Sequence, residues 1–214
     1  MEPSKPILNY FDMHARGETI RFLFYLAKVD YVDNRISKAD WPALKTSGKF
    51  EFSFLPMVEI DGHQLSFQST ILRYLGGKYG FYPEDVYYRY LIDSGMEAIK
   101  DFFDAFPYVI MFMTPTATEE EKNKAFMEFV AKLGPLFKIL ENRLKDNVSQ
   151  EFFVGDKWSI VDIFFFGLYW CMLCQPNFTA ILEAEYVKTP LIKTYVEKRL
   201  ASTDYPSIMQ KKDS

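Results

Sequence analysis

The fold is decided by the stretch Leu55-Pro56-Met57-Val58-Glu59-Ile60-Asp61-Gly62. Its first six residues are mostly apolar, which predicts a short strand over residues 55–60. Asp61-Gly62 then predicts a two-residue hairpin turn, because both residue types tolerate the positive φ angles that such a turn needs. Residues 64–67 are the expected partner strand, and a helix is expected from Ser69 onward because apolar side chains then recur at helical spacing.

The residues before this hairpin predict a strand, a turn, a helix and a second strand. Residues 6–11 form a short apolar run typical of a buried strand, and residues 12–17 resemble a turn. Residues 18–29 carry apolar side chains at helical spacing, and residues 31–36 predict a second strand, parallel to the first if the crossover has the usual hand. Residues 39–54 predict a short helix and loop. The first 80 residues therefore predict βαβ followed by ββα.

The chain changes character near residue 83. Glycines and Pro83 interrupt the pattern, and no convincing strand follows. Helical periodicity predicts helices over residues 86–113, 119–145, 159–175 and 190–201, with a break at Thr114-Pro115-Thr116. We therefore expect an α/β domain over residues 1–82 and an all-helical domain over residues 83–214.

Composition narrows the functional classes. Of 214 residues, 25 are basic and 29 acidic, so the net charge is −4, and no basic patch suggests a nucleic acid or an anionic membrane as partner. The first six residues lack the apolar core of a secretory signal. The most apolar stretch, residues 160–174, is short for a membrane span and contains Asp162, which predicts a buried helix. Two cysteines fit a reducing compartment, and we expect a cytoplasmic location.

Three positions are candidates for chemistry. Tyr10 ends the first predicted strand, the edge at which open α/β sheets bind ligands, although most aromatic residues on strands serve packing. Pro56 opens a strand, where a proline has no N–H for the ladder. Gln68-Ser69 lies where a helix is expected to begin, with Ser69 as a good N-cap, and a helix N-terminus can also bind carboxylates.

Other motifs favour structural roles. Ser159 and Asp162 have the spacing of a capping box. Cys171 and Cys174 have CxxC spacing but lie inside an apolar helical run, which favours two buried structural cysteines over a redox pair. His14 and His63 are far apart in sequence, with no ligand spacing around them, so no metal site is predicted.

Together these motifs resemble one family. The matching residues are Tyr10-Phe11, Arg16-Gly17-Glu18, Ile20-Arg21, Trp41, Lys45, residues 55–62, Gln68-Ser69, Ile71, Arg73-Tyr74-Leu75, and Gly155 with residues 159–162. In this order the chain resembles the cytosolic glutathione transferases, most closely the sigma class, which includes haematopoietic-type prostaglandin D synthases. The resemblance implies a thioredoxin-like domain, an all-helical domain and a homodimer.

The resemblance also implies roles for individual residues. Tyr10 would be catalytic by donating a hydrogen bond to the glutathione sulfur, which favours the thiolate. Glutathione would further contact Arg16, Trp41, Lys45, Leu55 (through its backbone, before a cis-Pro56), Gln68, Ser69 and, across the dimer, Asp101 of the partner subunit. Asp101 is equally compatible with a solvated helix face. Phe54 stands where sigma-type enzymes often have Gln. Lys100 adds a positive charge between Glu97 and Asp101, so no metal is expected there.

The second, hydrophobic substrate is expected to contact Met13, His14, Phe103 and Tyr108, although Phe103 also fits a core position. The implied function is a glutathione transferase that joins glutathione, its co-substrate, to small hydrophobic electrophiles, a detoxification reaction. The alternatives are a glutathione-dependent prostaglandin isomerase and a non-catalytic relative of the lens-crystallin kind.

Overall fold

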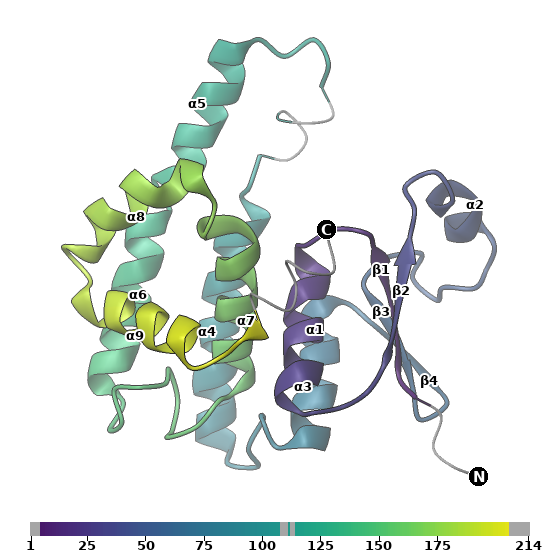
Figure 1. Cartoon of the computed structure of the whole chain (residues 1–214), viewed down its shortest axis with the longest axis horizontal. Helices are drawn as coiled ribbons and strands as arrows, with labels where there is room; N and C mark the ends of the chain where they lie inside the picture. Colours follow the sequence, from purple (N-terminus) through teal and green to yellow (C-terminus); the bar gives the residue numbers. More distant parts are fainter. Residues whose placement is uncertain (1–4, 108–110, 112–113, 206–214) are drawn as a thin grey trace.

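The structure is a computed structural model that describes residues 5–107, 111 and 114–205. Its first part is a four-stranded mixed sheet in the order β2-β1-β3-β4 (Figure 1). Strands β1 (Ile7–Phe11) and β2 (Val32–Ile36) are parallel, joined by α1 (Arg16–Leu26). Strands β3 (Met57–Ile60) and β4 (His63–Ser66) form an antiparallel hairpin, and α3 (Gln68–Tyr79) follows. The predicted βαβ-ββα order is confirmed.

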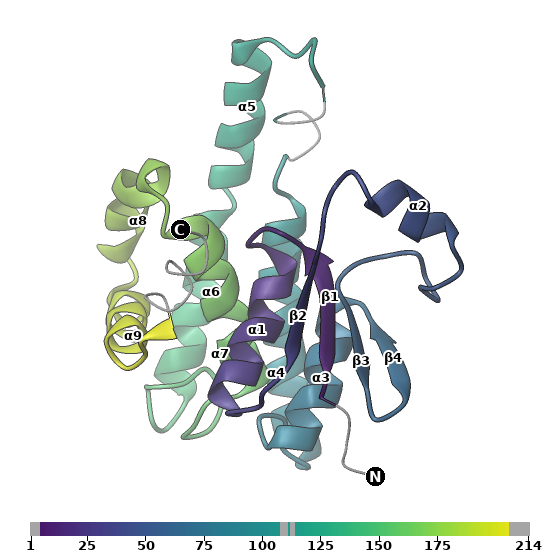
Figure 2. The same cartoon turned by 45° about the vertical axis from the view of Figure 1, so that its right-hand side comes forward.

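The sheet is covered on both faces. Helices α1 and α3 pack on one face, between the sheet and the helical part of the chain (Figure 1). The short helix α2 (Trp41–Thr46) lies on the opposite face (Figure 2), where Ile36, Phe50 and Met57 form a small separate cluster. The carboxyl end of β1, with Tyr10, therefore meets both the helical part and the segment leading to α2.

In the rest of the described chain all regular elements are helices, which confirms the predicted fold class. They are α4 (Val86–Asp104), α5 (Glu119–Val130), α6 (Leu133–Asp146), α7 (Ile160–Leu168), α8 (Thr179–Tyr186) and α9 (Pro190–Ala201). A π-helix, Tyr169–Leu173, continues α7, and a short 3-10 turn, Pro176–Phe178, precedes α8. Among the residues described, no helix is both long and apolar enough to cross a bilayer.

Prolines explain two wrong helix boundaries. The helix predicted over residues 86–113 ends at Asp104, because Pro107 disfavours helical geometry at Phe106 and would clash with the carbonyl of Phe103. The helix predicted over residues 119–145 is two helices, α5 and α6, because Pro135 cannot donate to the carbonyl of Ala131.

Two further differences are a helix that was not predicted and a helix that begins one residue earlier than predicted. Helix α8 was not predicted, although Leu182 and Tyr186 are buried four residues apart, as on a helix face. Helix α3 begins at Gln68, with Phe67 at the N-cap in a positive-φ conformation, so Ser69 is not the cap that its residue type favours. The first turn of α3 keeps backbone N–H groups that no side chain caps.

The predicted capping box of α7 is confirmed. The backbone N–H of Ser159 donates to Asp162 Oδ2 at 3.0 Å, and the Ser159 hydroxyl donates to the same oxygen at 2.5 Å. Asp162 Oδ1 accepts from the backbone N–H of Phe153 at 2.9 Å and from the Tyr195 hydroxyl at 3.1 Å. This fully buried carboxylate therefore joins the start of α7 to α9 and to the preceding loop.

Candidate functional site

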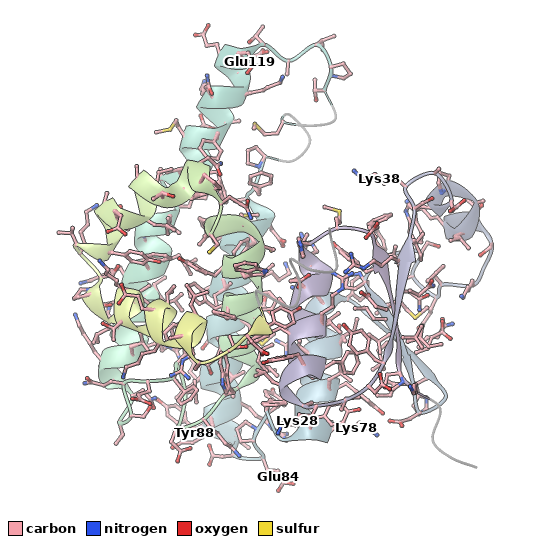
Figure 3. All side chains as sticks on the ribbon, in the orientation of Figure 1. Lys28, Lys38, Lys78, Glu84, Tyr88 and Glu119 are labelled. Atoms are coloured by element: carbon pink, nitrogen blue, oxygen red, sulfur yellow. The ribbon has the colours of Figure 1, made fainter. Side chains whose placement is uncertain are left out.

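A cavity of about 1270 Å³ opens where the end of β1 meets the helical part. Polar side chains line it from both parts of the chain, and those of the first part, which we call the polar wall, include Tyr10, Arg16, Lys38, Trp41 and Gln68. Lys38, on the segment between β2 and α2, reaches toward the side on which the helical part lies (Figure 3). Single-ligand pockets usually measure about 300–1000 Å³, so this cavity has room for two ligands side by side.

The apolar wall comes mainly from helices. Its members are aromatic, aliphatic and sulfur-containing side chains: Met13, Phe103, Phe106, Met111, Phe126, Phe164, Leu168, Cys171, Met172 and Phe178. Such side chains make adaptable walls for apolar ligands. The predicted hydrophobic-site residues Met13, His14 and Phe103 all line the cavity, and Tyr108 lies outside the described residues. Phe103 is buried as well, so it serves both the core and the cavity wall.

Tyr10 is held tightly at the junction of the two walls. Its side chain is only 5% exposed, and the Arg21 guanidinium lies 5.8 Å from the ring centroid. Burial raises the pKa of the Tyr10 phenol above 10.0, although the backbone and charge of Arg16 partly offset this effect. The phenol therefore stays protonated near neutral pH and can donate a hydrogen bond to a ligand in the cavity.

Gly17 fixes the position of the Tyr10 ring. A Cβ atom on Gly17 would lie 2.4 Å from Tyr10 Cδ1 and 2.7 Å from Cγ, much closer than carbon atoms approach each other. The first turn of α1 can therefore pack against the ring only because residue 17 has no side chain.

We expect Gly17→Ala to lower kcat/KM by about tenfold or more, because a displacement of the phenol by about 1 Å misplaces its hydroxyl. Steady-state kinetics would measure this loss, with folding checked by circular dichroism. Gly77→Ala is the matched control, since a Cβ on this helical glycine meets nothing within 4 Å. An active Gly17→Ala variant with unchanged kinetics would show that Tyr10 does not need this contact.

Arg16 does not face the cavity as an isolated charge. Its guanidinium pairs with Asp104 Oδ1 at 2.6 Å, and Lys100 pairs with Asp104 Oδ2 at 2.5 Å. Asp104, on α4, thereby joins the first turn of α1 to the helical part. The positive charge of Arg16, a predicted glutathione contact, is therefore partly neutralised, and Asp104 is a cavity residue that the sequence did not single out.

The residues predicted to bind glutathione fall into two groups. Tyr10, Arg16, Trp41 and Gln68 line the cavity, and Gln68 Nε2 donates to the Thr19 hydroxyl at 2.9 Å. Lys45, Leu55, Pro56, Ser69 and Asp101 are not among its lining residues. The Leu55–Pro56 bond is cis, as the resemblance implied. The Lys45 ammonium lies 5.7 Å from the centre of the Phe54 ring, and Asp101 is exposed on α4.

The cysteine interpretation needs correction. Cys171 is partly exposed and lines the cavity, and Cys174 is exposed, so the two are not a buried pair. The π-helix explains this difference, because its wider turns change the face on which residues after Leu168 lie. Burial raises the pKa of the Cys171 thiol, which disfavours its reactive thiolate.

Two acidic residues of α4, Glu97 and Asp104, are engaged in ion pairs. Glu97 pairs with Arg73 at 3.4 Å, and Lys100 pairs with Asp104. Within the described ranges, no three His, Cys, Asp or Glu side chains are grouped as they would be around a metal ion.

A buried ionic cluster lies behind the cavity wall. Glu18, on α1, is fully buried, and its Oε2 contacts His14 Nδ1 at 2.9 Å and Arg21 Nη1 at 3.0 Å. The Tyr205 hydroxyl donates to Glu18 Oε1 at 2.5 Å, and Arg21 Nη1 also donates to the Met13 carbonyl at 3.1 Å. Sequence periodicity placed Glu18 on a helix but could not show that its carboxylate organises the loop that lines the cavity.

Comparisons with known proteins identify relatives of this chain. A family model described as "Glutathione S-transferase, C-terminal domain" matches residues 99–202. Glutathione S-transferase A from Cavia porcellus is 33% identical over 195 residues, which cover 90% of this chain and 85% of that protein. The crystal structure of monomeric Na-GST-3, a glutathione S-transferase from Necator americanus, has a TM-score of 0.79 and 27% identity over 97% of each chain. Prostaglandin synthase D from Nilaparvata lugens has a TM-score of 0.76 over 97% of this chain and 98% of that chain, and at 23% identity it supports the fold alone.

Proposed function

Because the chain belongs to the glutathione S-transferase family and is a glutathione transferase, we propose that it joins the glutathione thiolate to small hydrophobic electrophiles in the cavity that Tyr10 faces. The observation that carries this proposal is the place of Tyr10. Its protonated phenol stands where the polar wall meets the apolar wall. Two substrates bound side by side would meet at this point.

Tyr10 acts as a hydrogen-bond donor in this proposal. A free cysteine thiol ionises at about 8.5, and only the thiolate is a good nucleophile. A phenol that donates to the sulfur stabilises the thiolate and lowers the thiol pKa. A buried phenol serves this purpose well because it keeps its own proton and loses no hydrogen bond to water. The sulfur, rather than the phenol oxygen, attacks the electrophile.

Glutathione is proposed to lie along the polar wall. Its γ-glutamyl carboxylate is placed at the first turn of α3, where Gln68 and Ser69 begin a helix whose N–H groups no side chain caps. Trp41 and Lys45 are placed at the glycyl end, and the Leu55 backbone at the cysteinyl amide. Asp101 is proposed to act across a dimer. The apolar wall then receives the electrophile, near Met13, His14 and Phe103.

A conjugation assay tests the function. We expect glutathione-dependent product formation with 1-chloro-2,4-dinitrobenzene well above the rate in buffer, together with retention of the protein on immobilised glutathione. Absence of both would overturn the proposal.

The comparisons do not favour a prostaglandin isomerase or a non-catalytic relative over the transferase.

We further propose a homodimer, with the chain divided near residue 83 into the two expected units. Phe52, Phe54 and Phe67 are 47%, 57% and 47% exposed, and their rings are neighbours, with centroids 5.0 Å apart for Phe52 and Phe67. Adjacent exposed aromatic side chains are typical of interaction surfaces. We propose that a second copy of the chain covers them.

The sigma class and a cytoplasmic location are proposed on the residue pattern and the low cysteine content alone.

Sedimentation velocity tests the dimer. We expect a dimeric mass for the unmodified protein and a shift toward the monomer in Phe52→Ser. Val148→Ser is the matched control, because Val148 is an exposed apolar residue outside this cluster. A monomeric unmodified protein would contradict the dimer while leaving the transferase function intact.

A further inference from the structure

A buried hydrogen bond joins helix α1 to the start of α3, where the γ-glutamyl group of glutathione is proposed to bind. Thr19, on α1, is fully buried, and its hydroxyl accepts from Gln68 Nε2 at 2.9 Å. The same hydroxyl donates to the carbonyl of Arg16 at 3.1 Å. Gln68 lines the cavity, whereas Thr19 is not among its lining residues. Thr19 therefore contacts a cavity residue from behind, on the side away from a ligand.

The Thr19 hydroxyl has one proton, and this fixes which way the Gln68 amide points. A hydroxyl donates once and accepts through its lone pairs. Because its proton goes to the Arg16 carbonyl, the amide atom beside it has to be the –NH2 nitrogen. A reversed amide would place its oxygen there and compete with Arg16 for the same proton. Both bonds can therefore form only when Gln68 Oε1 lies on the opposite side of the amide.

Gln68 Oε1 is left able to accept from a ligand. Among the residues that the structure describes, no donor reaches this oxygen, and it is not one of the buried polar atoms that lack a partner. It is therefore accessible from the cavity that Gln68 lines. An amide oxygen accepts from an ammonium group but has no proton to offer a carboxylate. The Gln68 side chain is thus prepared for a cationic group rather than for an anionic one.

Helix α7 holds Thr19 in this conformation. Helices α1 and α7 pack against each other (Figure 1). A Cβ atom on Gly167, in α7, would lie 2.9 Å from Thr19 Cα and 3.0 Å from Thr19 Cγ2. The backbones meet this closely only because residue 167 has no side chain. Thr19 Cγ2 has little room to move, so the hydroxyl keeps its direction toward Gln68.

We propose that Thr19 is a positioning residue for glutathione, because its hydroxyl holds the Gln68 amide so that Oε1 accepts a hydrogen bond from the ammonium group of the γ-glutamyl residue. This inference rests on the proposed function and adds to it a residue that does not touch the ligand. The carboxylate of the γ-glutamyl residue then lies at the N–H groups of α3, as proposed above. Without the Thr19 hydroxyl, the amide would also turn its N–H groups toward the ammonium, and binding would weaken.

Three ligands that differ only in the γ-glutamyl group test this assignment. They are S-methylglutathione, its analogue with a glutaryl group, which lacks the ammonium, and its analogue with a 4-aminobutyryl group, which lacks the carboxylate. Inhibition constants against glutathione are measured in the conjugation of 1-chloro-2,4-dinitrobenzene by the full-length protein. Thr19→Val keeps the side-chain shape and removes the hydroxyl. We expect it to raise the constants for S-methylglutathione and the 4-aminobutyryl analogue about fivefold, and that for the glutaryl analogue less than twofold.

Other variants separate positioning from general damage. Thr19→Ser keeps the hydroxyl and should leave all three constants within about twofold of the unmodified protein. In a Gln68→Ala background, Thr19→Val should add little, because Thr19 acts through Gln68. Thr194→Val, on α9, is the matched control, since its hydroxyl also donates to a carbonyl of its own helix, that of Pro190 at 3.0 Å, and it does not line the cavity. Thermal unfolding checks each variant, and Thr19→Ala replaces Thr19→Val if the latter does not fold.

Each other outcome has a defined meaning. Unchanged constants in the folded variant without the hydroxyl overturn the inference. An equal rise for all three ligands overturns it too, because the loss is then structural. A rise confined to S-methylglutathione and the glutaryl analogue shows that the amide nitrogen faces the ligand, which also overturns it. Absence of glutathione-dependent activity in the unmodified protein would instead count against the proposed function.

Discussion

Tyr10→Phe is expected to lower kcat/KM for conjugation at pH 6.5 by roughly 10- to 100-fold. The change removes one hydroxyl and keeps the ring, so packing against Gly17 and Arg21 is preserved. A hydrogen bond to a charged group contributes about 1.5–3 kcal/mol, which corresponds to this range of rates. Initial rates at several glutathione concentrations, measured across pH, would give the value.

The pH profile identifies the cause of the loss. Because the pKa of Tyr10 is raised by burial, the phenol keeps its proton over the assay range and donates throughout. In the unmodified protein, bound glutathione should therefore be a thiolate at pH values well below about 8.5, the pKa of a free cysteine thiol. The activity of the variant should rise as the pH approaches this pKa. Tyr79→Phe is the control, because it removes a hydroxyl from a tyrosine that does not line the cavity. Tyr79 lies at the C-terminal end of α3, whereas Gln68, which lines the cavity, lies at the N-terminal end. Equal activity in Tyr10→Phe at every pH would contradict the mechanism even within the assigned family.

Asp162→Ala is expected to destabilise the protein by about 3–5 kcal/mol, enough to prevent folding in a marginally stable chain. The fully buried Asp162 carboxylate accepts from Ser159, Phe153 and Tyr195. Removing it leaves all of these donors buried without a partner, and the cost of each unsatisfied group adds to the loss of the helix cap. Denaturant unfolding followed by circular dichroism would measure the free energy of unfolding.

The same motif in an exposed setting is the natural control for Asp162. Thr118 and Glu121 form a capping box at the start of α5, where the backbone N–H of Thr118 donates to Glu121 at 2.8 Å. Water can replace these bonds, so Glu121→Ala should lose much less stability than Asp162→Ala. Asp162→Asn should fall between the two, because the amide keeps one acceptor oxygen. Equal losses at residues 121 and 162 would show that burial is not what makes Asp162 important.

Local signals predicted the first part of the fold well. Asp61 and Gly62 have φ angles of 53° and 79°, the geometry expected of a two-residue hairpin turn. The hairpin places Ile60 opposite His63, and Tyr10 ends the buried strand that the apolar run indicated. These features depend on residue type and short spacing, which a sequence shows directly.

The cavity could be predicted only in part, for a physical reason. Phe164, Leu168 and Met172 recur four residues apart, and this spacing looks the same whether a side chain fills a core or lines a cavity. Asp104 was missed because its importance comes from Arg16, 88 residues away in sequence. The predictions for Lys45, Leu55, Ser69 and Asp101 depend on a bound ligand or a second subunit, so they stay predictions.

The polar wall around Tyr10 belongs to residues 10–68, whereas most of the apolar wall comes from residues beyond 100. The residues that contact the apolar ligand and those that hold Tyr10 can therefore be substituted independently of each other. Substitutions on α7 or on the π-helix that continues it can alter which apolar molecule is accepted, while Tyr10, Gly17 and Gln68 keep their places on the sheet and its helices. In evolutionary terms, such a chain can change the hydrophobic electrophiles that it accepts while the residues around the attacking thiolate stay the same.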